Sequence, residues 1–487
     1  MPPYLPLVLG PLPFLGAVLV TTLTALAAVL ISALRATRIR PTEALGEAAV
    51  EPSGLSRGRR LTGLALLAIA GGAFVTGLVQ HADFFTLVGL ANSMVLLLVI
   101  ATAVLGPLIA RTAVRLLAPP LTRTGVTGYL AAANTRADAG RLAGAITPLV
   151  LAVSFASTVV FTQTTALRES TDQVRSGLVA DHVLTAPNGL SPDLAAKVRE
   201  LKQVESATGL VESKVVAVGR MMGAPDAVSL GAQGVDPAGL GTTLDLHARD
   251  GDLKELSPAT VALSTTAASW LGLGDGTPFH GKVIAVYTPG LAFADVTLDH
   301  DLLLAHTTRK ADTSVLVRSG PGAQDAARAL SRVTAAYPGT VLRDGLATDD
   351  QVAQQRANAW VNYLVVGVII AYTAITVVNS LAMTTAARRR EFALLRLSGT
   401  ARRQVAAMMR RESAVVVLSG VGLGTLLSAF PLILVALALG GPPWPAVPVT
   451  GYAAIAGVTG ALAVAGTMVP VRVLLRIRPV EAIGSRE

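Results

Sequence analysis

Seven long apolar segments divide the chain, and charged stretches separate them. Each segment approaches or exceeds about 20 residues, the length that an α-helix needs to cross the hydrocarbon core of a bilayer. The pattern predicts an α-helical multispan membrane protein with about seven transmembrane helices. The expected spans are Leu5–Leu34, Leu61–Gln80, Phe85–Ala110, Ala143–Thr164, Trp360–Thr384, Ala414–Leu439 and Gly451–Val473.

The charges between these segments predict an orientation. One set of connections, with Arg472, holds 23 basic and 8 acidic residues, and every base in it is Arg. This set comprises 35–60, 111–142, 385–413 and 474–487. The long stretch 165–359 holds 17 basic and 22 acidic residues, including all six Lys. Short positive connections remain in the cytoplasm. We therefore expect a membrane protein whose residues 165–359 are extracytoplasmic and whose C-terminus is cytoplasmic.

The long stretch 165–359 alternates between strand and helix patterns and predicts an inserted α+β domain. Polar flanks without Gly or Pro, Thr164–Ser176 and Ala347–Trp360, are expected to continue the adjacent spans as helical stalks. Ser191 is the expected N-cap of a helix that follows the first strand. The expected strands are Ala180–Ala186, Val211–Met221, Ala259–Ser264, Lys282–Tyr287 and Thr313–Val317, and the expected helices are Ser191–Leu201, a short one ending at Trp270, and Gly322–Ala336.

A nine-residue phrase occurs twice, each time after an apolar segment. Residues 38–46 read RIRPTEALG and residues 476–484 read RIRPVEAIG. A repeated ending indicates two related units, of which the first is incomplete. The expected divisions are 1–50 (last span and tail of a first unit), 51–125 (two connecting spans), 126–164 (elbow and first span of the second unit), 165–359 (inserted domain with stalks) and 360–487 (three-span domain).

The composition of the chain excludes several classes of protein and function. Charged residues make up only 15% of the chain and apolar residues 52%, whereas a soluble domain has about 25% charge. There is no Cys, which excludes disulfides and thiolate catalysis. Aromatic residues are only 4% of the chain and no basic surface interleaved with them is evident, so the net charge of +9 indicates topology and not nucleic-acid binding.

The stretch 388–412 reads RRREFALLRLSGTARRQVAAMMRRE. Phe392, Leu395 and the nearby Leu394 suggest an apolar stripe on a short helix that also bears Arg. Gly399 is a natural helix terminator, and Ser398 or Thr400 could cap the next helix. Such a helix could dock in a groove of a soluble partner, or it could rest on anionic headgroups.

This stretch, the closing RPVEAI phrase and the segment 261–276 resemble FtsX-like permeases, the MacB-type (type VII) ABC transporter family. The resemblance covers 126–487 and the end of a first unit in 1–50, and it implies a short form with an incomplete first permease unit. It also implies a cytoplasmic ABC ATPase dimer and a second permease copy or longer relative as partners. The residues expected to couple to the ATPase are Arg390, Glu391, Phe392, Leu394, Leu395, Arg396 and Gly399.

The sequence gives little indication of nucleotide binding, metal binding or catalysis by this chain. No P-loop motif occurs, so we expect ATP hydrolysis in a partner and no catalytic residue or cofactor here. His300 and His306 could share a site with Asp299 and Asp301, but their spacing fits no metal motif, so solvated side chains are the default. Gly420 and Gly424 form a GxxxG pattern that either permits close helix packing or arises by chance.

The function expected from these features is the permease subunit of an ABC transporter, in which ATP hydrolysis by a separate subunit moves the extracytoplasmic domain to export a substrate. One alternative is an FtsX-type mechanotransmitter that regulates a cell-wall hydrolase without transport. A second alternative is an ATP-independent membrane sensor or binding protein.

Overall fold

The computed structural model describes residues 56–79, 84–122, 139–221, 224–273, 278–279, 281–287, 293–320, 323–344 and 389–475, with isolated helical positions in 18–34 and 367–385. Residues 1–55 form a separate unit from 56–487. The expected spans Leu5–Leu34 and Trp360–Thr384 therefore fall largely outside the described residues, as does the stalk Ala347–Trp360.

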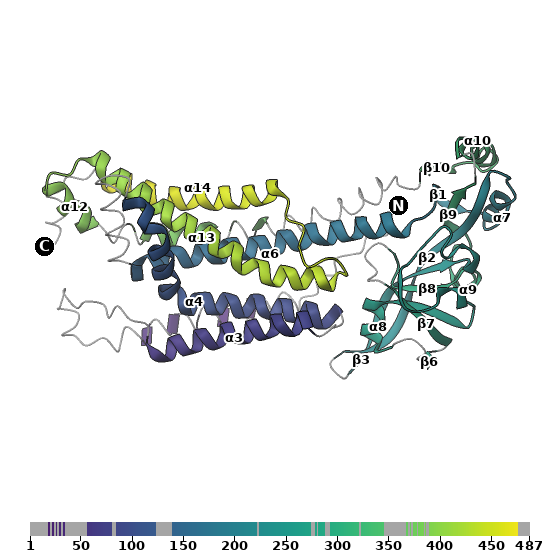
Figure 1. Cartoon of the computed structure of the whole chain (residues 1–487), viewed down its shortest axis with the longest axis horizontal. Coiled ribbons are helices and arrows are strands. Elements are labelled where there is room, and N and C mark those ends of the chain that lie inside the picture. The colour runs from purple at the N-terminus through teal and green to yellow at the C-terminus, as the bar shows by residue number, and fades with distance from the viewer. Residues whose placement is uncertain are drawn as a thin grey trace. The chain divides into compact units, whose positions relative to one another are not determined.

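The other five expected spans are confirmed as helices long and apolar enough to cross a membrane. They are α3 (Arg57–Val79), α4 (Phe84–Thr122), α6 (Ala139–Gly177), α13 (Arg402–Ala438) and α14 (Val449–Leu474). Helix α13 packs against α4, α6 and α14, while α3 packs against α4 (Figure 1). The hydrophobic core between α6 and α13 includes the aliphatic side chains Leu149, Val150, Val415 and Val416.

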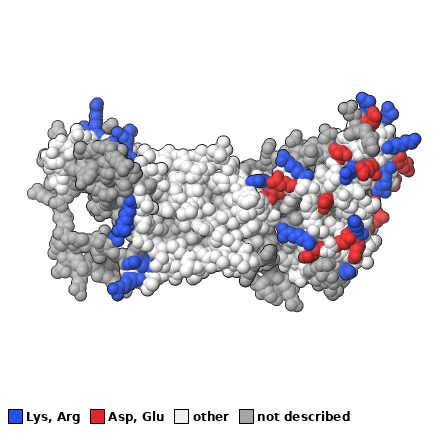
Figure 2. Space-filling view, in the orientation of Figure 1, with Lys and Arg blue, Asp and Glu red and all other residues white. Residues whose placement is uncertain are grey.

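The described charges of these helices lie toward their ends. Arg57 and Arg59 begin α3, Arg402 begins α13, and Arg472 lies in the last turn of α14. Figure 2 shows a broad uncharged band along the helices, with Arg side chains at one end, which we call the basic end. An uncharged band is the surface that lipid tails require, because an unpaired charge is costly in hydrocarbon.

The Gly420–Gly424 pattern is explained by the packing of α13 against α6. A Cβ on Gly420 would lie 2.7 Å from the Cβ of Leu149, and one on Gly424 would lie 2.7 Å from the Cβ of Val153. A Cβ on the intervening Gly422 would meet no atom within 4 Å. The two outer glycines thus allow the backbones to approach, as small residues do between membrane helices.

Helix α6 leaves the bundle and continues into the inserted domain. Its residues beyond the apolar run, Thr164–Ser176, remain helical as far as Gly177, which confirms the first stalk. At its end Leu178 pairs with Leu244, and the amide of Asp245 donates to the Gly177 carbonyl at 2.7 Å.

The inserted domain contains one mixed sheet in the order β10-β1-β9-β2-β3-β8-β5-β7-β4, with β6 paired to β7. Its strands are β1 (His182–Leu190), β2 (Val204–Met221), β3 (Ala224–Val235), β4 (Ala248–Gly251), β5 (Thr260–Ser264), β6 (Pro278–Phe279), β7 (Gly281–Tyr287), β8 (Val296–Asp299), β9 (Asp312–Ser319) and β10 (Val341–Asp344). Its helices are α7 (Asp193–Arg199), α8 (Thr265–Leu271), α9 (His300–His306) and α10 (Ala323–Thr334), with single turns at Pro237–Gly239 and Leu253–Glu255.

Two lobes share this sheet. The first lobe has the chain order β1-α7-β2, then β9-α10-β10, with antiparallel spatial order β10-β1-β9-β2. This is the βαββαβ arrangement of ferredoxin-like domains. The second lobe is inserted between β2 and β9, and it contains the parallel pairs β3–β8 and β5–β7. Each lobe has its own aliphatic core, around Leu194 and Leu330 in the first and Leu263 and Val283 in the second.

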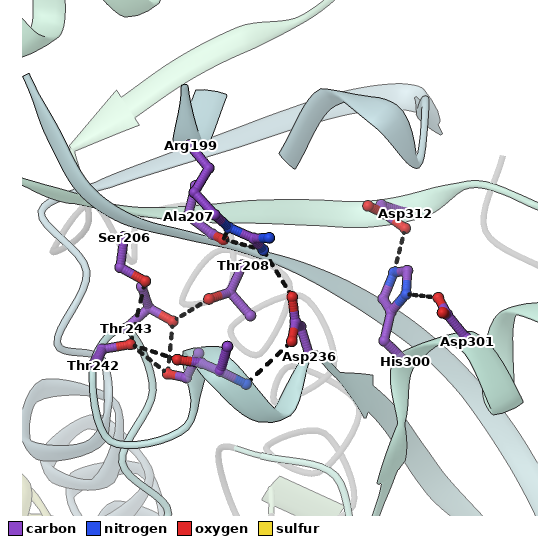
Figure 3. Close-up of polar contacts among 12 residues, drawn as sticks. Arg199, Ser206, Ala207, Thr208, Asp236, Thr242, Thr243, His300, Asp301 and Asp312 are labelled. Carbon is purple, nitrogen blue, oxygen red and sulfur yellow. Dashed lines mark hydrogen bonds and ion pairs between the residues drawn. The ribbon is translucent and has the colours of Figure 1, made fainter. Parts of the chain in front are cut away.

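Hydrogen bonds fix the crossing from the first lobe to the second (Figure 3). The Arg199 guanidinium donates to the Ala207 carbonyl at 2.8 Å and to the Asp236 carboxylate at 2.7 Å. The hydroxyl of Thr243 donates to that of Thr208 at 2.8 Å, and both are fully buried. These bonds join α7 and β2 to the turn that follows β3 in the second lobe.

One expected cap in this domain is wrong. Ser191 is not the N-cap of α7, because Pro192 occupies that position and no side chain caps the helix. The Ser191 carbonyl accepts the Leu194 amide at 2.9 Å, and the regular helix begins at Asp193, one residue later than expected.

Candidate functional site at the arginine-rich hairpin

The Arg-rich stretch folds as the short helix α12 (Arg389–Leu397), a tight turn and the start of α13. Gly399 ends α12 with φ 91°, a left-handed conformation that Gly adopts without a steric cost. The expected cap by Ser398 or Thr400 is wrong: the N-cap of α13 is Ala401, whose amide donates to Gln404 Oε1 at 2.9 Å.

Phe392 attaches α12 to the ends of the long helices. It is 2% exposed, and its cluster contains Val405 and Met409 of α13 together with Val471 and Leu475 at the end of α14. Arg396 adds a polar contact, because its Nη1 donates to the Leu475 carbonyl at 3.2 Å. Helix α12 is therefore attached to both α13 and the end of α14.

A second polar contact joins α13 to α14 deeper in the bundle. The Ser413 hydroxyl lies 2.8 Å from that of Thr467, and both residues are buried. A hydrogen bond between neighbouring membrane helices contributes about 0.6 kcal/mol on average. The two helices are thus held together by both apolar and polar contacts below the hairpin.

The opposite face of α12 presents leucines. Leu394 is 54% exposed and Leu397 is 56% exposed, and residues three apart lie on one face of a helix. The expected apolar stripe required Leu394 to share a face with Phe392. It does not, because residues two positions apart are rotated by about 200° about the helix axis. Arg390, Glu391 and Leu395 lie within the helix, but their side chains fall outside the described residues.

Of the His and Asp residues considered for a metal site, His300 and Asp301 contact each other (Figure 3), whereas Asp299 and His306 bond to backbone groups. Asp299 caps α9 by accepting the Leu302 amide at 3.1 Å, and the ring of His306 contacts the Leu302 carbonyl at 2.8 Å. His300 instead lies 2.8 Å from Asp312 on β9, with Asp301 on its other nitrogen at 2.8 Å. Within the part of the chain that the structure describes, no group of three His, Cys, Asp or Glu could hold a metal ion.

His300 and Asp312 form a buried ion pair, so the default expectation of a solvated histidine is wrong. The Asp312 side chain is fully buried and that of His300 is 13% exposed. The hydrogen bond that His300 donates to Asp312 raises the pKa of His300 to about 9, although desolvation opposes this shift. Sequence reasoning missed Asp312, because nothing in the spacing shows that β9 lies beside α9.

These features define a multispan helical membrane protein with an inserted two-lobed α+β domain and a short helix attached at the basic end of its bundle. Residues 363–479 match the family model of the FtsX-like permease C-terminal domain, so this part of the chain is an FtsX-like permease domain. The expected resemblance to FtsX-like permeases is thereby confirmed for residues 363–479.

Two solved structures are similar in part. The periplasmic region of MacB from Actinobacillus actinomycetemcomitans covers 38% of this chain at 15% identity, and 97% of that chain is matched, with a TM-score of 0.29. The extracellular domain of the noncanonic ABC-type transporter YknZ from Gram-positive bacteria covers 33% at 12% identity, and 98% of that chain is matched, with a TM-score of 0.26. No curated protein matches the chain.

Proposed function

We propose that this chain is the permease subunit of an ABC transporter in a bacterial cytoplasmic membrane, and that α12 receives the movement of a separate cytoplasmic ATPase dimer. The observation that carries the proposal is the two-sided construction of α12. Phe392 and Arg396 fix one face to α13 and α14, while Leu394 and Leu397 remain exposed on another. A short helix with an exposed i, i+3 leucine pair suits a groove on a partner.

The orientation follows from the charges. In this proposal the basic end of the bundle is cytoplasmic, with α12 and the C-terminus in the cytoplasm and residues 165–359 outside, as the positive-inside rule favours. Helix α6 then connects the inside to the inserted domain without a break. Movement of the ATPase dimer would reach the outer domain along α13, α6 and their shared packing, and there it would drive export or extrusion of a substrate. A second permease copy or a longer relative would complete the transporter.

Docking is tested by placing charge on the exposed leucines. The double substitution Leu394→Asp with Leu397→Asp is expected to lower the amount of P-loop ATPase that co-purifies with the tagged permease by tenfold or more, because losing a central apolar contact costs about 2 kcal/mol or more. Quantitative mass spectrometry of the complex from native membranes measures this. Glu391→Arg is expected to act in the same direction.

The matched control places the same two charges on Val216 and Val218 of β2, which are 72% and 67% exposed. That variant should retain the ATPase. Phe392→Ala is not a suitable test, because it would loosen α12 from the permease itself. Equal retention by both double variants would refute docking at α12, and a wild-type permease that retains no P-loop ATPase would refute the proposed function.

The lysines give a separate test of orientation. All six lie between Lys197 and Lys310, within the inserted domain. A membrane-impermeant amine reagent added to intact spheroplasts is expected to modify these lysines fully, as peptide mass spectrometry would show. Modification only after the membrane is permeabilised would place the domain in the cytoplasm and reverse the topology.

A further inference from the structure

The connection between α13 and α14 is an apolar loop with the sequence GGPPWPAVP at 440–448. Trp444 is 62% exposed, Val447 is 43% exposed, and Val449 at the start of α14 is 82% exposed. Pro443 and Pro445 flank Trp444, and Pro448 follows Val447. Each proline fixes its own backbone φ. The loop therefore presents large apolar side chains outward on a backbone of restricted freedom.

This loop is bonded to α6 where the apolar part of α6 ends. The Thr164 hydroxyl donates to the Ala446 carbonyl at 2.6 Å, and the Ala446 amide donates to the Thr165 hydroxyl at 3.0 Å. The first charged residue of α6 beyond its apolar run is Arg168, one turn further on. Figure 1 shows the connection from α13 to α14 passing α6.

The loop approaches α6 closely at a second point. A Cβ on Gly441 would lie within 2.5 Å of a carboxylate oxygen of Glu169, so a larger residue at this position would have to displace that side chain. Glu169 is 8% exposed. Contacts on both sides of Trp444 thus hold the loop against α6.

We propose that the 440–448 loop is an interfacial anchor, in which Trp444 and Val447 enter the outer headgroup region of the bilayer while the Ala446 bonds hold α6 at that level. The loop joins two membrane helices directly, so its depth is set by the chain and coincides with the bilayer surface. Tryptophan is enriched at this level because its ring is amphipathic. The proposal requires only that these helices span a membrane, so it stands or falls separately from the ATPase.

The lipid contact is tested with Trp444 as the only tryptophan, in a Trp270→Phe and Trp360→Phe background. The purified protein is placed in phosphatidylcholine nanodiscs whose acyl chains are brominated either near the headgroup or near the chain end. Fluorescence is expected to fall most with the shallow bromines, and aqueous iodide should quench little. A Val216→Trp variant without the other tryptophans provides a reference in the inserted domain, at a position whose side chain is 72% exposed.

Strong quenching by iodide with none by brominated lipid would show a loop in water and overturn the proposal. Quenching by neither agent would show that protein, such as a second permease copy, covers Trp444, and it would overturn the proposal as well. Greater quenching by the deep bromines would contradict the interfacial depth.

The hold on α6 is tested by Thr165→Val, which keeps the shape of the side chain and removes its hydroxyl. Hydrogen exchange of the 442–449 peptide is expected to accelerate about fivefold, since one hydrogen bond contributes about 1 kcal/mol. Thr171→Val is the control, because Thr171 lies more than one turn further along α6 than Thr165. It should leave the hydrogen exchange of the 442–449 peptide unchanged. Equal exchange in wild type and Thr165→Val would refute the role of these bonds.

Discussion

Gly424→Val is expected to separate α13 from α6 and to leave little folded permease. A Cβ at this position would lie 2.7 Å from the Cβ of Val153 and 2.9 Å from the carbonyl oxygen of Val150. The oxygen belongs to the backbone of α6 and cannot rotate away. Overpacking in a close-packed interior costs about 1–3 kcal/mol. Valine adds two further methyl groups, so we expect a cost at the upper end of this range. Thermal unfolding of the detergent-solubilised protein measures the effect.

Gly422→Val is the matched control, because it has the same change on the same helix two residues away. A Cβ there would meet nothing within 4 Å, so its unfolding midpoint should remain near that of the wild type. Equal midpoints for the two variants would show that α6 and α13 do not approach each other as described.

His300→Ala is expected to destabilise the inserted domain by about 3–5 kcal/mol, the cost of leaving a buried charge without its partner. The fully buried Asp312 would lose the cation 2.8 Å away. His306→Ala is the control, because that side chain is exposed and its ring contacts only the Leu302 carbonyl. Urea unfolding of the full-length protein, followed by hydrogen exchange of peptides from β9, measures the difference.

The same pair predicts a pH dependence. The pKa of His300 is raised from its ordinary value of 6.5 to about 9 in the folded protein, so the folded state holds the proton more tightly. Its contribution to stability is therefore complete below pH 6.5 and is lost as the pH rises through 9. The wild-type domain should weaken over this range, and the His300→Ala variant should lack that part of the slope. A slope that is the same in both proteins would contradict the raised pKa.

The membrane helices could be predicted from the sequence because their apolar runs exceed the length of any ordinary strand. The strands of the inserted domain were harder to predict. Strand β3 was not expected, since Ala224–Val235 includes Pro225 and two glycines, residues that disfavour strands. Its pairing with β2 over twelve positions compensates for this low propensity.

The sequence located the candidate site, but it did not predict which way each side chain of α12 faces. The resemblance selected the stretch around Glu391, whereas the opposite directions of Phe392 and Leu394 depend on where α13 and α14 end. Pairs that are distant along the chain, such as Thr165 with Ala446, leave no local pattern in a single sequence.

Helix α6 contains no Gly or Pro between Pro148 and Gly177, a distance of about 40 Å at 1.5 Å per residue. Sharp bends in helices occur almost always at such residues or at inserted side chains and waters. A helical stretch of this kind is stiff, so in the proposed mechanism a twist at its membrane end would carry through to the base of the inserted domain.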